Sequence, residues 1–202
     1  MGLPASGLLA TGLLAGGEIR VVVTARGATE AEDRTLHELL AREASGNPAL
    51  TLSRRCAVCG SHAHGAPTVD APGLFVSLSR AGGLVAFALS AAPVGVDIES
   101  VAAVARRDID SVAFTSKERE RLASSGRADL LRAELWAGKE AVLKLRGTGL
   151  RVEPSSFELA KSRETRHPFA PGSGLVGVAA GTGRLTLILD RAGHGTEIGT
   201  DP

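Results

Sequence analysis

Several residue types that would indicate a specialised class of protein are scarce or missing in this 202-residue sequence. Tyrosine is absent, and two cysteines, Cys56 and Cys59, are too few for a disulfide scaffold. No apolar run reaches the roughly 18 to 20 residues that cross a bilayer. The formal net charge of +1 gives no basic field for nucleic acid or an anionic membrane. We therefore expect neither of these as a partner.

The composition that remains is that of an ordinary globular protein. Hydrophobic residues make up 44% of the chain and charged residues 22%, which is enough for a packed core. Residues 1–17 are rich in Leu, Ala and Gly but lack the positive start of a signal peptide, because the first arginine is Arg20. We expect a cytoplasmic protein. Of the 23 basic residues only four are lysines, so each lysine is more informative than an arginine: Lys117, Lys139, Lys144 and Lys161.

The strand and helix patterns predict an α+β fold in two halves, residues 1–93 and 94–202. In the first half, residues 18–25 form a β-branched strand. A helix follows from Thr29 to Ala44, with Thr29 and Glu32 as a capping box. Residues 54–72 are expected to be loop with at most short strands, and residues 73–100 a three-stranded meander.

The second half contains the main helical pattern. One helix is expected to begin at Thr115 and a longer one to run from about Ala128 to Leu145, ended by the glycines that follow. The tail from Gly193 has no core pattern. Further strands are predicted at 156–160, 175–179 and 184–190.

Carboxylates in the stretch VGVDIE (94–99) indicate a possible cation site. Strand alternation places Asp97 and Glu99 on one face and the apolar residues on the other. Two carboxylates on one face suit Mg²⁺ that also takes phosphate oxygens. The alternative is a strand with one solvated face, and this motif taken alone favours that alternative.

Two further stretches lie on predicted helices. In FTSKE (114–118) the spacing of Thr115 and Glu118 makes a capping box, which explains Glu118 by structure alone. In WAGKEAVLK (136–144) Trp136, Glu140 and Lys144 form one helical stripe with Lys139 beside it. This set suits a site for a metal and a phosphate. The alternative is an ordinary amphipathic helix with a surface pair.

Gly138 lies in the middle of that helix, where glycine costs about 1 kcal/mol relative to alanine. The position indicates either the close approach of another group or a chance substitution.

A fourth stretch has the residue types of a zinc site. Its candidates are Cys56, Cys59, His62 and His64. Zinc modules normally separate their ligand pairs by a longer loop, so the spacing favours thiols in a turn over a structural zinc.

Together and in this order, the three motifs resemble the signature of the Sfp-type 4′-phosphopantetheinyl transferases. That signature is a (V/I)G(V/I)D-x-E strand, an F-(S/T)-x-x-E helix start and then W-x-x-K-E-x-x-x-K. The segments 56–67, 75–83 and 146–159 are also similar to parts of the family, so the resemblance covers about residues 30–160.

The resemblance implies a pseudo-dimeric α+β fold of two similar halves, with coenzyme A (CoA) in the cleft between them. It implies the transfer of phosphopantetheine from CoA to a serine of an apo acyl or peptidyl carrier protein, with release of adenosine 3′,5′-bisphosphate. We expect the protein to act as a monomer.

The resemblance also implies roles for individual residues. Asp97, Glu99 and Glu140 would hold Mg²⁺ or Mn²⁺, and Glu140 would serve as the base. Cationic contacts to phosphate would come from Lys139 and Lys144. The remaining candidates for CoA binding are Arg34 for the 3′-phosphate, Ser79 and Arg80 for the nucleotide phosphates, and His64 near the adenine.

Three features depart from the family pattern. Ala66 stands where a lysine or arginine is common, Arg80 stands where many members have histidine, and the sequence after about Arg163 does not match well. These departures keep open a second hypothesis, a non-catalytic relative that binds CoA or a carrier protein. A third is a small zinc-stabilised interaction domain.

Overall fold

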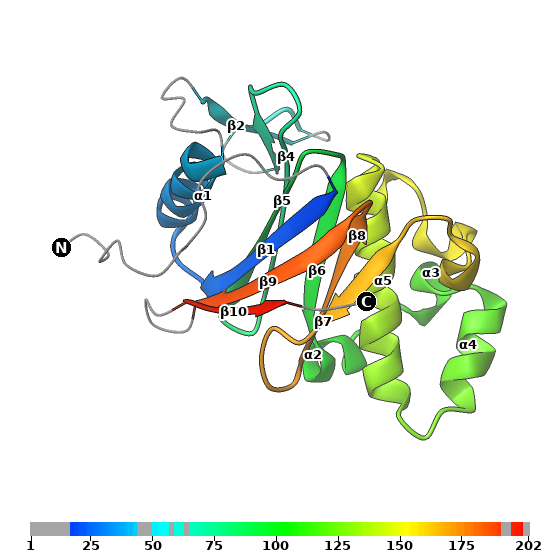
Figure 1. The fold of residues 1–202 in the computed structure, drawn as a ribbon. Helices are drawn as coiled ribbons and strands as arrows, with labels where there is room; N and C mark the ends of the chain where they lie inside the picture. The colour runs from blue at the N-terminus through cyan, green and yellow to red at the C-terminus, as the bar shows by residue number, and fades with distance from the viewer. Residues whose placement is uncertain (1–16, 44–49, 57–58, 63–64, 191–194, 200–202) are drawn as a thin grey trace.

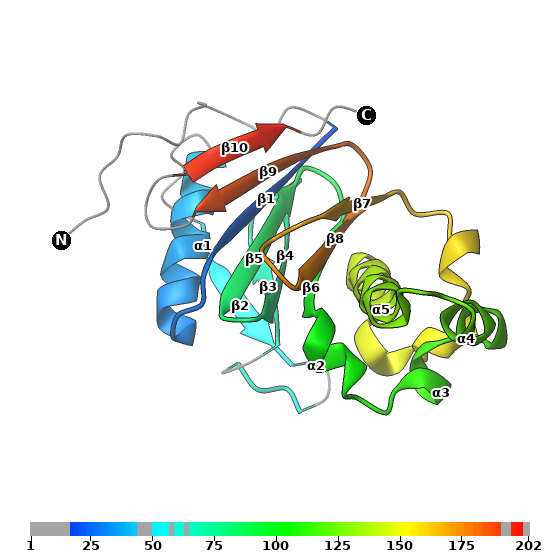
Figure 2. The ribbon, with the colours of Figure 1, turned by 90° about the horizontal axis from the view of Figure 1, so that it is seen from below.

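A computed structural model describes residues 17–43, 50–56, 59–62, 65–190 and 195–199. The chain is built in layers, with α1 on one outer side, two β-sheets in the middle and α5 on the other (Figures 1 and 2). The fold is therefore α+β, as predicted. None of the helices in these ranges is both long and apolar enough to cross a membrane.

The larger sheet in the described residues has the strand order β10-β9-β1-β5-β4. Its central strand β1 is antiparallel to β5 and parallel to β9. Because β9 and β10 come from the end of the chain, the predicted boundary after residue 93 does not separate the two sheets. The strands are β1 (Glu18–Ala25), β4 (Phe75–Ala81), β5 (Leu84–Ser90), β9 (Arg184–Asp190) and β10 (Gly195–Gly199).

The smaller sheet has the order β6-β8-β7, with both outer strands antiparallel to β8. Its strands are β6 (Val94–Ser100), β7 (Arg166–Phe169) and β8 (Leu175–Gly181). A separate antiparallel pair consists of β2 (Leu52–Arg55) and β3 (Ala66–Val69), the short strands expected in the loop region.

Strand β6 does not continue the meander that the sequence predicts. β4 and β5 pair with each other, but β6 pairs with β8. The apolar face of β6 packs across the larger sheet instead of extending it. β4 and β6 still lie against each other, because the Val96 amide donates to the Ser77 hydroxyl over 3.0 Å.

Most helices lie on the outer side of the smaller sheet (Figure 2). The bounds of α5 agree with the prediction. The expected strand at 156–160 is wrong, because these residues form 3-10 turns, and α2 and α3 were not predicted. The helices are α1 (Thr29–Glu43), α2 (Val101–Ala105), α3 (Asp110–Ala113), α4 (Ser116–Ala123), α5 (Ala128–Leu145), and the 3-10 turns η1 (Gly149–Arg151), η2 (Pro154–Ser156) and η3 (Leu159–Lys161).

The start of α1 differs from the predicted capping box. Thr29 already lies in the helix, and the Glu32 amide donates to the Ala28 carbonyl over 3.0 Å. The Glu32 carboxylate pairs with Arg80 on β4 instead of turning back to the helix start. The Glu32 carboxylate thus binds Arg80, which is distant in sequence, instead of forming the predicted capping box with Thr29.

Strand alternation divides the apolar side chains between the layers. On β1, Val21 packs between the two sheets, whereas Val22 packs beneath α1. On β6, Val94, Val96 and Ile98 face the larger sheet. The opposite face of β6 is left for α5, and this face carries the carboxylates of the first motif.

Candidate active site

The site is formed where β6 and α5 approach each other without an intervening side chain. A Cβ on Gly95 would lie 1.9 Å from the Ala141 carbonyl oxygen and 2.6 Å from the Leu145 amide nitrogen. Only glycine allows backbones this close. The contact brings the polar face of β6 against the helical stripe of the third motif.

Asp97 is almost completely buried at this contact, with 4% of its surface exposed. Its Oδ1 accepts a hydrogen bond from Lys144 Nζ and another from Ser79 Oγ, each over 2.7 Å. Its Oδ2 is buried and has no hydrogen-bond partner among the described residues. A buried carboxylate oxygen without a donor is costly, so this atom is suited to an additional cationic ligand.

Lys144 is fixed by three acceptors. Besides Asp97, its Nζ donates to the Val96 carbonyl over 3.0 Å and to the Leu78 carbonyl over 3.4 Å. The ammonium therefore joins α5 to both β6 and β4.

Glu99 lies two residues further along the same face of β6. Its Oε1 accepts from Trp136 Nε1 over 2.9 Å and from Arg107 Nη1 over 3.2 Å. Burial raises the pKa of Glu99, and the negative charge of Asp97 adds to the increase. Trp136 thus contributes both to the apolar packing and to the polar site.

Glu140 lies on the stripe between Trp136 and Lys144. Burial raises its pKa to about 7; Lys144 opposes the shift, whereas Asp97 and Glu99 increase it. The three carboxylates therefore influence one another electrostatically. In the described part of the chain, however, no three His, Cys, Asp or Glu side chains are placed closely enough to hold a metal ion.

Lys139 faces away from this site, which corrects the expected phosphate contact. It is fully buried, and Nζ lies 2.7 Å from Glu118 Oε2 and from the carbonyl oxygens of Pro154 and Phe157. With its ammonium enclosed by these acceptors, it cannot reach a phosphate in this structure. Burial lowers the pKa of Lys139.

Glu118 has the capping role that its spacing predicts. Its carboxylate accepts from the Thr115 amide over 2.9 Å, and the Thr115 hydroxyl accepts from the Glu118 amide over 3.2 Å. The other carboxylate oxygen accepts from the Leu159 amide over 2.8 Å. Glu118 and Lys139 together connect α4, α5 and the 3-10 turns.

Gly138 makes room for Leu159, whose Cδ2 would lie 2.6 Å from a Cβ at this position. The mid-helix glycine is therefore explained by the close approach of another group.

A cavity of about 360 Å³ adjoins the carboxylate cluster at Lys144. Arg54 supports one part of its wall, because Nη1 donates to the Gly65 carbonyl over 3.3 Å. The cations in the lining are Arg80, Lys144 and Arg151. The full lining is Gly65, Ala66, Pro67, Val76, Ser77, Leu78, Arg80, Lys144, Gly147, Thr148, Gly149 and Arg151.

The predicted coenzyme residues have different positions relative to this cavity. Arg80 lines it and is oriented by Glu32, which accepts from its Nε over 2.6 Å. Ser79 is buried and donates to Asp97, so the structure places it with the carboxylates instead of the cavity. Arg34 is exposed on α1 and is not among the lining residues, so its contact with the 3′-phosphate stays a prediction. His64 lies outside the described residues.

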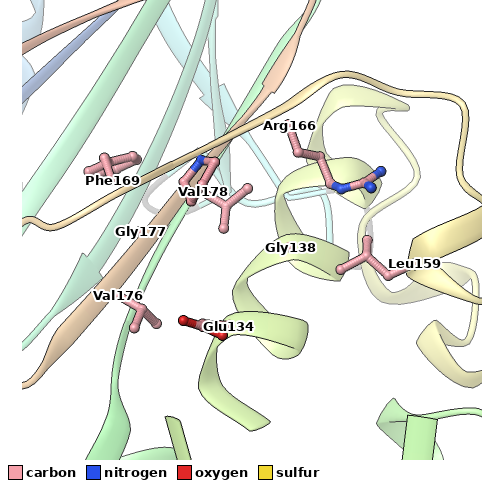
Figure 3. A pocket seen from close by; sticks show the side chains of 9 residues that line it. Glu134, Gly138, Leu159, Arg166, Phe169, Val176, Gly177 and Val178 are labelled. Atoms are coloured by element: carbon pink, nitrogen blue, oxygen red, sulfur yellow. The ribbon is translucent and has the colours of Figure 1, made fainter. Parts of the chain in front are cut away.

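A second cavity, of about 550 Å³, lies on the other side of α5 and is shown in Figure 3. Its wall is mainly apolar, including Leu159, Phe169 and Val176, with Glu134 and Arg166 as its charged residues. Glu134 lines this second cavity and is not in the lining of the smaller one. Because Lys144 contacts Asp97 and also lines the smaller cavity, we assign the candidate active site there.

The cysteine stretch lies partly outside the described residues. Cys56 and Cys59 form no disulfide, and His62 Nδ1 bonds with the Arg54 carbonyl over 2.8 Å. Since His64 is outside the described residues, the zinc hypothesis remains a prediction without a test.

The sequence model of the 4′-phosphopantetheinyl transferase superfamily matches residues 93–171. This region belongs to that superfamily. It contains the three carboxylates and Lys144 of the phosphopantetheinyl transferase signature, whereas Ser79 and Arg80 precede it. A search of curated proteins finds no match to the chain.

Sequence reasoning missed several parts of this candidate site. Arg107 follows α2, which has no clear sequence pattern, yet it reaches Glu99. Arg151 lines the cavity because the chain turns back after α5. The glycines at 147 and 149 were a usable signal for this turn, but they do not indicate which side chain it presents.

Proposed function

We propose that this protein transfers 4′-phosphopantetheine from CoA to a serine hydroxyl of an apo acyl or peptidyl carrier protein. The observation that carries the proposal is the position of Lys144, which contacts the buried Asp97 and also lines the cation-rich cavity. The region that matches the superfamily supplies both groups.

The cavity suits a ligand with several phosphates. Arg80, Lys144 and Arg151 line it without an aspartate or glutamate in the lining. Apolar side chains such as Val76 and Leu78 supply packing surface for an adenosine. Its volume of about 360 Å³ is typical of small-molecule sites. CoA, with a diphosphate and a 3′-phosphate, matches this charge and chemistry.

Asp97, Glu99 and Glu140 fit a divalent metal in their donor chemistry. Carboxylate oxygens are the ligands that Mg²⁺ prefers, and Mn²⁺ accepts the same set. Asp97 Oδ2 is buried without a hydrogen-bond partner among the described residues, and burial together with the neighbouring carboxylates raises the pKa values of Glu99 and Glu140. A bound cation would stabilise the ionised form of all three groups. When bound, the metal would neutralise charge on the diphosphate.

Glu140 is suited to act as the base. With a pKa of about 7, it is partly ionised at neutral pH and can accept a proton from the attacking serine. The serine oxygen forms a bond to the phosphorus that carries pantetheine, and the bond from this phosphorus to the bridging oxygen breaks. Adenosine 3′,5′-bisphosphate leaves with the electron pair. Lys144, whose side chain lines the cavity, would offset the developing charge on the phosphate oxygens.

The layered architecture supports two similar halves around a central cleft. Each sheet is covered on its outer face by one main helix, α1 or α5, and the candidate site lies where β4 meets β6. We propose that this arrangement is the pseudo-dimeric fold of the family, with strands β9 and β10 added to the first sheet.

The acceptor would dock beside the cavity, and the protein would act as a monomer in the cytoplasm. Arg119 and Arg121 on α4 and Arg127 before α5 are exposed and could contact an acidic carrier helix. A solvated helix face is the alternative for any one of them.

The test compares Glu140→Gln with the matched variant Glu134→Gln, because Glu134 is on the same helix but is exposed and does not line the smaller cavity. Transfer is followed by intact-mass spectrometry of an apo carrier protein, and folding by circular dichroism. Glu140→Gln should abolish transfer while the protein stays folded, and Glu134→Gln should behave like the wild type. Near-normal turnover in Glu140→Gln contradicts the assignment. CoA binding without transfer by the wild type would instead indicate the non-catalytic relative.

A further inference from the structure

Arg151 differs from the other cations of the cavity in how its charge is balanced. Arg80 pairs with Glu32, and Lys144 pairs with Asp97. The contacts of Arg151 in the described residues are to carbonyl oxygens: Nε donates to Thr148 over 3.0 Å and Nη2 to Gly147 over 2.9 Å. Its guanidinium is therefore held in place while its positive charge remains available to a ligand.

The turn after α5 gives this arginine its position. Gly147 has a φ of 67° and Gly149 a φ of 51°, a left-handed conformation that favours glycine. The turn brings Arg151 back over the end of α5. Carbonyl oxygens at a helix C-terminus carry partial negative charge, which repels an anion. By covering two carbonyls of this turn, Arg151 makes this part of the wall attractive to an anion.

Another segment of the lining lacks a charge. Gly65, Ala66 and Pro67 contribute no ionisable side chain to the cavity. Lys144 and Arg80 each pair with a carboxylate. Among the cations that line the cavity in the described residues, Arg151 is therefore the one whose charge is not balanced by a carboxylate.

We propose that Arg151 recognises a phosphate monoester beyond the end of α5, which in CoA is the 3′-phosphate. The inference rests on the proposed function, because it takes CoA as the ligand. It predicts that Arg151 makes the protein discriminate between CoA and dephospho-CoA, which lacks this phosphate.

Isothermal titration calorimetry of the full chain with CoA and with dephospho-CoA tests the proposal. Arg151→Ala should weaken CoA binding about tenfold, as expected for losing a charge-assisted hydrogen bond, and leave dephospho-CoA binding unchanged. Arg163→Ala is the matched control, because Arg163 is exposed and lies outside the cavity lining. Unchanged CoA binding in Arg151→Ala, or an equal loss for both ligands, would overturn the proposal.

A second variant distinguishes phosphate recognition by Arg151 from a purely structural role in binding the carbonyls of the turn. Arg151→Lys keeps the charge but cannot reproduce the planar two-carbonyl contact. If Arg151 recognises phosphate, this variant should retain most of the preference for CoA. If it loses the preference as fully as Arg151→Ala, the role is structural and the proposal fails. A wild-type protein that prefers CoA but transfers nothing contradicts the proposed function alone, whereas one that does not bind CoA overturns both.

Discussion

The buried ion pair between Lys139 and Glu118 gives a prediction that separates a structural lysine from a phosphate ligand. Lys139→Met removes the ammonium and leaves a carboxylate that is 1% exposed without its cation. It also leaves the carbonyls of Pro154 and Phe157 without the donor that lies 2.7 Å from each. Breaking one partner of a buried pair costs about 3–5 kcal/mol of folding free energy.

Thermal and urea unfolding measure this loss directly. For a domain of this size the melting temperature should fall by on the order of 10 °C. The control is Lys161→Met, because Lys161 pairs with Glu158 at the surface and should show no measurable change. CoA affinity of Lys139→Met, measured below its melting temperature, should stay close to that of the wild type. Unchanged stability together with a large loss of CoA affinity would refute this account and restore Lys139 as a phosphate ligand.

Four further predictions concern residues of β6 and α5. Gly95→Ala should destabilise the fold by at least about 3 kcal/mol, because its Cβ would lie 1.9 Å from a backbone oxygen of α5. Gly138→Ala should cost less than about 1 kcal/mol in urea unfolding, because its Cβ meets only the tip of a leucine side chain and alanine favours the helix; equal losses would contradict the argument. Without metal, the wild type should lose about 3 kcal/mol of folding free energy as pH rises from about 4.5 through 7, because the raised pKa of Glu140 favours its protonated form in the folded state. In Glu140→Gln the slope should become shallower and keep only the part that comes from Glu99, whose pKa is also raised; an unchanged slope would assign it to other groups. Mg²⁺ should change the emission of Trp136, the single tryptophan, through its 2.9 Å bond to Glu99, and the response should be lost in Glu99→Ala.

Local patterns in the sequence predicted the elements that carry the site. The β-branched strand at 18–25 and the helix from Ala128 to Leu145 have strong periodicity and clear ends, and the structure has both with the predicted bounds. The alternation of VGVDIE also predicted that Asp97 and Glu99 share a face. These features depend on neighbours in sequence, so a single chain reveals them.

Interactions between distant segments could not be predicted in the same way. The spacing of Lys139 on the helix resembles that of a site residue, and only the position of Glu118 and the 3-10 turns shows that it faces inward. Residues 195–199 have no core pattern, yet they pair with β9 as an edge strand. An edge strand needs only backbone hydrogen bonds on one side, so its side chains carry little signal.

Intact-mass spectrometry of an apo carrier protein tests the central claim most directly. The carrier is incubated with the wild-type protein, CoA and Mg²⁺, and a parallel sample contains EDTA. The account predicts that the carrier gains one phosphopantetheine unit, and that EDTA prevents the gain. No mass increase on acyl or peptidyl carriers, from protein shown to be folded and able to bind CoA, would contradict it.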